Sequence, residues 1–355
     1  MKKISLILSL MTSVFVFISC NKENPGEDTK SGYKHGAFIT NEGAFGNSNG
    51  SVSYFKPDSA KIINHLFELV NGRPLGDVVQ SMSVYDDKAF IVVNNSQKVE
   101  VVDLSTFESL GVIEGLEYPR YFLAVSDQKG YLTDGNLAGK VLVINTETIQ
   151  ITDTILCGMG PEHLLLYKKF LLVANSGGWG NDSTITVIDT KSDEVTATWQ
   201  TGFNPTDLCL DENDNLWVLC KGKVVWDGWT LAEETQSSLV LMDPDKGEVM
   251  QTLAIGMTGD FYWPQSLGMT DDQSAVYFLE SGGLYRMDID QDVVPSSPLI
   301  ANYFYGFGIE PETGSIYGMA CPSFTANGYL VRYQSDGSFI DSTEVGIGPN
   351  RIVFN

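Results

Sequence analysis

Short runs of hydrophobic residues alternate with polar residues along most of the chain, and few of them extend far enough for a helix. Runs such as AFIVV, FLLVA and LWVLC are followed by alternating runs such as KVEVVD, KVLVIN and TITVID. Each group opens with the same motif, Pro-x-x-apolar or an equivalent without proline, near residues 78, 119, 161, 205, 264, 304 and 349. Four short strands repeated at roughly 40 to 45 residues predict the blades of a β-propeller.

The seven groups predict an all-β, seven-bladed propeller with four-stranded blades over residues 36–355. The last group has room for one strand only, whereas residues 36–55 resemble residues 170–189 and share the pattern N-x-G-x-aromatic-G-N. The C-terminal strand is therefore expected to join the N-terminal blade, which closes the ring and removes open sheet edges. A non-closing sandwich or a pair of smaller barrels is the alternative. One longer interval predicts an insertion at residues 221–238 in the fifth repeat.

Large aromatic residues gather in the loops of one face. In a propeller, the loops between the second and third strands of a blade share a face with the loops that connect blades. Exposed aromatic side chains in such loops indicate a binding surface, although packing between neighbouring loops is the alternative for any one of them. The candidate ligand-binding residues on this face are Phe45, Tyr118, Arg120, Trp179, Phe203, Trp226, Trp229, Tyr262, Trp263, Tyr305 and Arg351.

The chain is strongly acidic, with 45 acidic and 22 basic residues and a formal net charge of −23. Binding to nucleic acid requires stripes of Lys and Arg, and the sequence contains no such cluster, so a nucleic-acid partner is excluded. Many of the acids fall in the turns expected on the face opposite the aromatic loops. They are interpreted as a solvated surface, and the aromatic face remains the candidate for binding.

The N-terminal segment has the pattern of a lipoprotein signal peptide. Lys2 and Lys3 precede an apolar stretch from Ile4 to Ile18, which is too short to span a membrane. Ser19-Cys20 then resembles a lipobox, so residues 1–19 are expected to be removed and Cys20 to be lipidated. Ordinary secretion is the alternative. Residues 20–35 are polar and predict a flexible tether, so that the only membrane contact is the lipid anchor.

No catalytic or metal-binding motif is evident, and neither enzyme activity nor a cofactor is expected. The three histidines lack metal-ligand spacing, and Cys157, Cys209, Cys220 and Cys321 form no C-x-x-C pair, so they are interpreted as buried free thiols. Polar residues do end the second strands of several blades: Asn41, Asn94, Asp134, Asn175 and Glu280. A calcium-dependent hydrolase uses similar ligands, but hydrogen bonding to the backbone is the expected role for most of them.

The motifs also resemble a known family. The lipobox at Cys20, the G-x-x-P anchors such as Gly158-Met-Gly-Pro161 and the V-x-V-I-D third strands are similar to YncE-type propellers. A lipid-anchored single propeller of this size resembles the BtuG-type vitamin B12-binding surface lipoproteins of Bacteroidetes. The resemblance implies capture of a bulky amphipathic ligand, a corrinoid, at the cell surface and its transfer to a TonB-dependent outer-membrane transporter. The alternatives are a metal-dependent hydrolase or lyase and a protein-interaction scaffold of the cell envelope.

Overall fold

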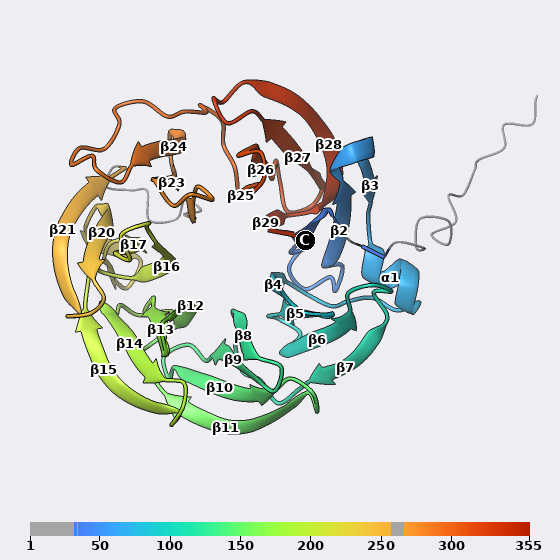
Figure 1. The fold of residues 1–355 in the computed structure, drawn as a ribbon, viewed down its shortest axis with the longest axis horizontal. Helices are drawn as coiled ribbons and strands as arrows, with labels where there is room; N and C mark the ends of the chain where they lie inside the picture. Colours follow the sequence, from blue (N-terminus) through green and yellow to red (C-terminus); the bar gives the residue numbers. More distant parts are fainter. Residues whose placement is uncertain (1–31, 34, 257–265) are drawn as a thin grey trace, which may run out of the picture.

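Seven antiparallel sheets surround a central axis and form a seven-bladed β-propeller (Figure 1). The structure is a computed structural model that describes residues 32–33, 35–256 and 266–355. The expected signal peptide, Cys20, most of the expected tether, Tyr262 and Trp263 lie outside the described residues. Within the described residues, no helix is long and apolar enough to cross a bilayer.

The strands of each blade follow one another from the channel to the outer rim. Blades one and two are β29 (Pro349–Phe354), β1 (Ala37–Asn41), β2 (Ser51–Lys56), β3 (Lys61–Ile63), and β4 (Val79–Tyr85), β5 (Lys88–Val93), β6 (Lys98–Asp103), β7 (Ser109–Ile113). Blades three and four are β8 (Phe122–Ser126), β9 (Lys129–Asp134), β10 (Lys140–Asn145), β11 (Gln150–Leu156), and β12 (Pro161–Tyr167), β13 (Phe170–Asn175), β14 (Thr184–Asp189), β15 (Glu194–Gln200). Blade five is β16 (Pro205–Leu210), β17 (Leu216–Cys220), β20 (Ser237–Asp243), β21 (Glu248–Ile255), and blade seven is β25 (Gly306–Ile309), β26 (Ile316–Ala320), β27 (Asn327–Tyr333), β28 (Phe339–Ile347).

Blade six is the least regular of the seven. Its assigned strands are β22 (Leu267–Met269), β23 (Ala275–Glu280) and β24 (Gly283–Asp288), and a single bridge from Ile300 to Leu284 occupies the fourth position. The predicted insertion in blade five is confirmed as a separate hairpin of β18 (Val224–Asp227) and β19 (Thr230–Glu234). A 3-10 turn (Pro57–Ser59) and the short helix α1 (Leu66–Asn71) complete the elements.

The ring closes as predicted, by pairing of the C-terminal strand with the N-terminal blade. In the antiparallel pair of β29 and β1, Phe38 lies opposite Val353 and Ile39 opposite Ile352. Two backbone hydrogen bonds of 2.9 Å between Gly36 and Asn355 extend the pairing, and Figure 1 shows β29 beside the N-terminal strands. The first and last described segments therefore stabilise one another, and the inner edge of β1 is paired.

Hydrophobic side chains pack between adjacent blades and form the core. Trp217 of β17, for example, is fully buried between blades five and six, and its indole N–H donates to Asp211 at 3.1 Å. Tyr33 lies within the segment expected to be a tether, yet it is buried against Phe38 and Phe107. The packed domain therefore begins before residue 36.

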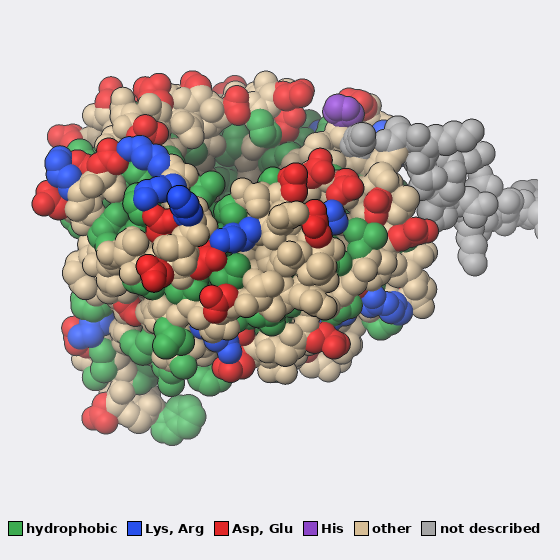
Figure 2. All heavy atoms as spheres, turned by 60° about the horizontal axis from the view of Figure 1, so that its bottom comes forward, with side chains coloured by type: hydrophobic (Ala, Val, Ile, Leu, Met, Phe, Trp, Pro, Cys, Tyr) green, Lys and Arg blue, Asp and Glu red, His purple; other side chains and the backbone are tan. Residues whose placement is uncertain are grey.

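Acidic residues in the turns between third and fourth strands have a structural role. Asp103 accepts hydrogen bonds from the backbone N–H groups of Ser105 and Thr106, at 2.9 and 2.8 Å. Asp189 and Asp243 accept equivalent bonds in blades four and five. These Asx turns explain why aspartate recurs there, since its side chain replaces a missing backbone partner. Figure 2 shows acidic side chains spread along the upper rim of that view.

Candidate binding site

The candidate site lies at the end of the channel where the innermost strands begin. We call this side the mouth face. It carries the loops between second and third strands and the connections between blades, and the opposite face carries the remaining turns. Side chains from several innermost strands, joined by one lysine of blade five, form what we call the mouth cluster: Gln80, Arg120, Tyr121, Glu162, His163, Asp207, Lys221, Ser266 and Arg351.

Arg351 links four blades through its guanidinium group. From blade one it donates to the Tyr121 hydroxyl at 2.8 Å, to Asp207 at 3.3 Å and to the Ser266 hydroxyl at 3.2 Å. These partners belong to blades three, five and six, so the side chain extends across the channel. The guanidinium carbon also lies 5.3 Å from the centre of the Tyr121 ring. Arg351 therefore braces the inner ring of strands against one another.

Arg120 forms a second ion pair closer to the aromatic loops. Its Nε donates to both carboxylate oxygens of Glu162, at 2.9 and 3.0 Å, and another of its nitrogens donates to Gln80 at 2.6 Å. The guanidinium carbon lies 5.3 Å from the centre of the Tyr118 ring, where a cation is attracted to the π face. Arg120 thus joins the charged centre to the aromatic surface above it.

His163 lies beside the buried carboxylate of Asp207. Its Nδ1 lies 3.1 Å from Asp207, but the two groups are not aligned for a hydrogen bond, and Nδ1 is buried with no partner among the described residues. Burial lowers the pKa of His163 more than the carboxylate of Asp207 raises it. Burial alone would raise the pKa of Asp207, but His163, Arg351 and the N–H of Leu267 together hold it below its ordinary value.

Burial shifts the pKa of two further titratable groups, Lys221 in the mouth cluster and Glu42 beside it. Burial lowers the pKa of Lys221, and Arg120 and Arg351 lower it further, against the raising effect of Glu162. Burial also raises the pKa of Glu42, although hydrogen bonds from Tyr305 and Asn350 and the charges of both arginines oppose the shift. Desolvation therefore destabilises the charged form of each group.

Aromatic side chains border this charged centre on the mouth face. The rings of Tyr118 and Trp179 meet edge to face with centroids 6.4 Å apart, and those of Tyr305 and Phe324 do so at 5.2 Å. Trp179 is 80% exposed. Large hydrophobic side chains that remain this exposed in a folded domain indicate an interaction surface.

Glycine packing fixes the loop that presents Trp179. Gly178 has a φ of +57°, which favours glycine, and a Cβ added at Gly160 would lie only 2.0 Å from the Gly178 nitrogen. The Trp179 N–H donates to the Asn136 side chain at 2.8 Å. Asn181 accepts from the N–H of Val224 at 3.2 Å and donates to its carbonyl at 2.8 Å, which ties this loop to the inserted hairpin.

The structure brings together some of the predicted site residues and separates others. Tyr118, Arg120 and Trp179 form one contiguous group, and Phe203 lies near the hairpin, with Lys223 Nζ 5.6 Å from its ring centre. Tyr305 donates to Glu42 at 3.1 Å and pairs with Phe324. Of the remaining described candidates, Phe45 is 77% exposed in the loop between β1 and β2, and Trp226 and Trp229 are 50% and 100% exposed in the inserted hairpin.

Sequence reasoning did not select several residues that the structure places at the centre. Lys221 follows the second strand of blade five and belongs to no sequence motif. Tyr121 and Gln80 are marked in the sequence only by their position shortly after an anchor motif. Repetition of that position was the one signal that could have found them, because equivalent residues of successive blades converge on the channel. Leu137, which is 57% exposed, also lies in a mouth-face loop and was not selected.

The polar residues at the ends of second strands mostly serve the backbone, as expected. Asn94 donates to the Pro119 carbonyl at 2.9 Å, and Asp134 accepts from the N–H groups of Glu117 and Tyr118. Asn175 donates to two threonine hydroxyls of β14, each at 2.9 Å. These bonds hold strands together, although the Oδ1 atoms of Asn41 and Asn175 are buried without a hydrogen-bond partner among the described residues. Within the described part of the chain, no group of three His, Cys, Asp or Glu side chains is placed to hold a metal ion.

The four described cysteines, Cys157, Cys209, Cys220 and Cys321, are free thiols in the structure. Burial raises the pKa of Cys157 and of Cys220 to about 12, so both stay protonated at neutral pH. They behave as small hydrophobic side chains. The sequence interpretation as buried thiols holds for Cys220 and Cys321, whereas Cys157 and Cys209 are only partly buried.

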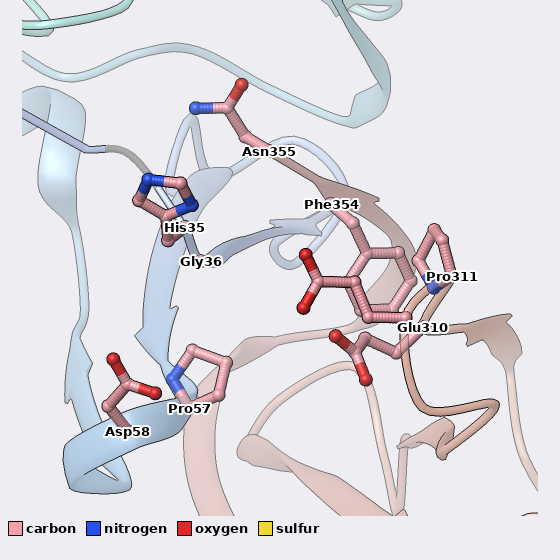
Figure 3. A pocket seen from close by; sticks show the side chains of 9 residues that line it. His35, Gly36, Pro57, Asp58, Glu310, Pro311, Phe354 and Asn355 are labelled. Atoms are coloured by element: carbon pink, nitrogen blue, oxygen red, sulfur yellow. The ribbon is translucent and has the colours of Figure 1, made fainter.

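A hollow of about 290 Å³ lies on the opposite face (Figure 3). Its lining includes His35, Asp58, Glu310 and the C-terminal Phe354 and Asn355, and the labelled carboxylates and His35 border it from different elements. Aromatic side chains do not gather there as they do at the mouth.

Solved structures with the same fold come from several kinds of bacterial protein. A quinonprotein alcohol dehydrogenase-like protein from Bacteroides thetaiotaomicron is 13% identical, with 92% of this chain and 79% of that chain covered and a TM-score of 0.66. A periplasmic gluconolactonase from Pseudomonas aeruginosa is 12% identical, covering 90% and 99%, with a TM-score of 0.63. AztD from Citrobacter koseri is 10% identical, covering 89% and 96%, with a TM-score of 0.54. At these identities the likeness shows the fold alone.

Comparison by sequence gives a family without an assigned activity. No curated protein matches the chain. Residues 35–345 match the family model described as a domain of unknown function, DUF5074, a range that includes most of the propeller. The chain therefore belongs to the DUF5074 family.

Proposed function

We propose that this protein is a binding propeller whose mouth face captures a bulky amphipathic ligand. The observation that carries the proposal is the exposed Trp179, whose ring meets the half-buried Tyr118 directly beside the Arg120–Glu162 ion pair. Aromatic surfaces take up flat apolar groups, and a few convergent polar groups fix their orientation. A ligand that combines both kinds of surface fits this arrangement.

A corrinoid is the candidate ligand with the most support. It is a large, flat ring system that carries amide groups at its edge, so it combines the two kinds of surface that the mouth face presents. The repeat and lipobox patterns of the sequence support the same candidate. Asp134, one of the residues that a propeller hydrolase would use as metal ligands, accepts from the backbone N–H groups of Glu117 and Tyr118, and this favours binding over metal-dependent turnover.

Calorimetric titration of the purified protein with cyanocobalamin tests this proposal. We expect saturable heat at micromolar concentrations, and we expect Trp179→Ala to weaken binding about tenfold or more, as for a buried aromatic contact at an interface. Phe339→Ala is the matched control, because Phe339 is 63% exposed and begins β28 on the opposite face. Absence of heat with the wild-type protein would sink the corrinoid assignment.

We also propose that the protein is anchored by a lipid on Cys20, exposed at the outer membrane, and passes its ligand to a TonB-dependent transporter. The lipobox pattern supports this arrangement. Growth with a labelled fatty acid should label the wild-type protein and not Cys20→Ala. Protease added to intact cells should degrade the anchored protein, and complete protection would contradict exposure at the surface.

A further inference from the structure

The inserted hairpin of β18 and β19 is not part of the propeller scaffold. It forms a two-stranded sheet of its own, while β17 pairs directly with β20 in blade five. Of its two strands only Val224 is buried, and Trp226, Trp229 and Leu231 are exposed. A two-stranded hairpin is marginally stable on its own in water. The hairpin therefore needs support from outside itself, and its exposed aromatic side chains make it a candidate for binding.

Two asparagine side chains hold the base of the hairpin against the loop that carries Trp179. Asn181 donates to the Val224 carbonyl at 2.8 Å and accepts from the Val224 N–H at 3.2 Å, as a neighbouring strand would. The buried Asn204 donates to the Asn181 side chain at 2.9 Å and to the Gly222 carbonyl at 2.8 Å. We call Asn181 and Asn204 the amide clamp, because together they fix the hairpin to the mouth face.

The amide clamp places the hairpin beside Trp179. Trp179 lies two residues along the chain from Asn181, and Trp226 lies two residues from Val224. Since two residues span at most about 7 Å, the bonds between Asn181 and Val224 keep both tryptophans within reach of one bulky ligand. Tyr118 meets the Trp179 ring with centroids 6.4 Å apart. These three aromatic side chains thus belong to one part of the mouth face.

We propose that the hairpin is a second wall of the ligand site, in which Trp226 contacts an apolar part of the ligand and Asn181 is a positioning residue. This inference rests on the proposed function, because it assigns the hairpin to the same ligand that Trp179 binds. A ligand that reaches both tryptophans carries apolar surface at more than one place. The ligand class is therefore a bulky amphipathic molecule and not a single small ring. A wall that is already held in place loses less conformational entropy on binding.

Removal of the hairpin tests whether it contacts the ligand. Residues 224–234 are replaced by Asn-Gly, which joins Lys223 to Thr235 in a two-residue turn. The Thr235 N–H already donates to the Lys223 carbonyl at 2.9 Å, so the strands of blade five are kept. We expect cyanocobalamin to bind at least about tenfold more weakly by calorimetry, as when an aromatic contact at an interface is lost. Equal affinity overturns the inference. If the shortened protein does not fold by circular dichroism, Trp226→Ser replaces it with the same expectation.

A matched asparagine tests the positioning role of Asn181. Asn71 also ties two segments together, since it donates to the Phe107 carbonyl at 3.0 Å and accepts from the Ser109 N–H at 2.8 Å on the opposite face. Asn181→Ala and Asn71→Ala should both lower stability. Only Asn181→Ala should weaken cyanocobalamin binding, by about threefold or more, and speed hydrogen–deuterium exchange of residues 222–226 in the free protein. Unchanged exchange there, or equal binding by the two variants, overturns the positioning role.

The two proposals fail separately. If the shortened protein binds cyanocobalamin as tightly as the wild type does, the second wall is removed and the proposed function stays intact. If the wild type binds no cyanocobalamin, the corrinoid is removed, and the comparison is repeated with anilinonaphthalene sulfonate, a flat amphipathic dye. A dye affinity that falls on removal of the hairpin supports the second wall. An unchanged dye affinity, or no binding of the dye, overturns it.

Discussion

Replacing Arg351 tests whether the cross-channel contacts stabilise the propeller. Arg351→Met keeps much of the side-chain volume but removes the bonds to Tyr121, Asp207 and Ser266. Asp207, whose side chain is only 3% exposed, would lose its nearest full positive charge. It would keep the backbone N–H of Leu267 at 3.0 Å. The variant therefore leaves the buried carboxylate of Asp207 without its arginine partner, and the remaining N–H group stabilises its charge only in part.

The cost follows from the burial of the pair. Breaking a buried ion pair by removing one partner costs about 3 to 5 kcal/mol. We take about 3 kcal/mol, the lower end, because Arg351 is 24% exposed and solvent weakens its contribution. For a domain of roughly 320 residues, with about 2.1 cal/mol/K of unfolding entropy per residue, this corresponds to a midpoint about 4 °C lower.

Thermal unfolding monitored by circular dichroism at pH 7 measures the effect. Arg286→Met is the matched control, because Arg286 pairs with Asp288 at 2.7 Å while both side chains are 36% and 45% exposed. A surface pair of this kind contributes about 0 to 1 kcal/mol. Adding Asp207→Asn to Arg351→Met should recover part of the loss, since no charge is then left buried. Equal midpoints for the two arginine variants would refute the bracing role.

Further predictions concern other buried carboxylates. Burial raises the pKa of Glu42, so the wild-type protein loses stability as pH rises above about 4.5, the unfolded value, and Glu42→Gln should be the more stable protein at pH 8 and not at pH 4. Unfolding midpoints across this range measure the difference, and a constant difference would contradict it. Glu100 is fully buried and accepts from Arg73 at 2.6 Å and Lys98 at 2.9 Å. Its pKa is lowered because these bonds outweigh burial, so its contribution is present above the unfolded pKa of 4.5 and is lost as pH falls. Glu100→Gln should cost about 1 to 2 kcal/mol at pH 7 and less at pH 3.5, measured by urea unfolding. An equal cost at both pH values would show that charge is not involved.

The fold could be predicted from the sequence because each blade repeats the same pattern of apolar and polar residues. Apolar runs bury between neighbouring sheets, and anchors such as Pro161 and Pro205 mark where innermost strands begin. Even ring closure could be predicted, because the pattern around Asn41 matches that around Asn175. The irregularity of the sixth blade could not be predicted, because the sequence of its outer strand shows no alternation of apolar and polar residues.

The site was accessible only in part. Exposed aromatics such as Trp179 stand out in a sequence, since turns seldom require them. The partners of Arg351 do not stand out in the sequence, because they lie 85 to 230 residues away from it. They contact Arg351 only once the blades have closed into a ring. Lys221 likewise acquires its role from charges on other blades. Burial and charge, which determine the pKa of such groups, are properties of the assembled channel and not of a motif.

Hydrogen–deuterium exchange with and without cyanocobalamin tests the central claim most directly, because it reports which face the ligand covers. The account predicts that ligand slows exchange in the loops of the mouth face, residues 176–183 and 221–236. Exchange in the turns of the opposite face, residues 57–60 and 310–314, should be unchanged. Protection confined to the opposite face would contradict the assignment of the mouth as the binding surface.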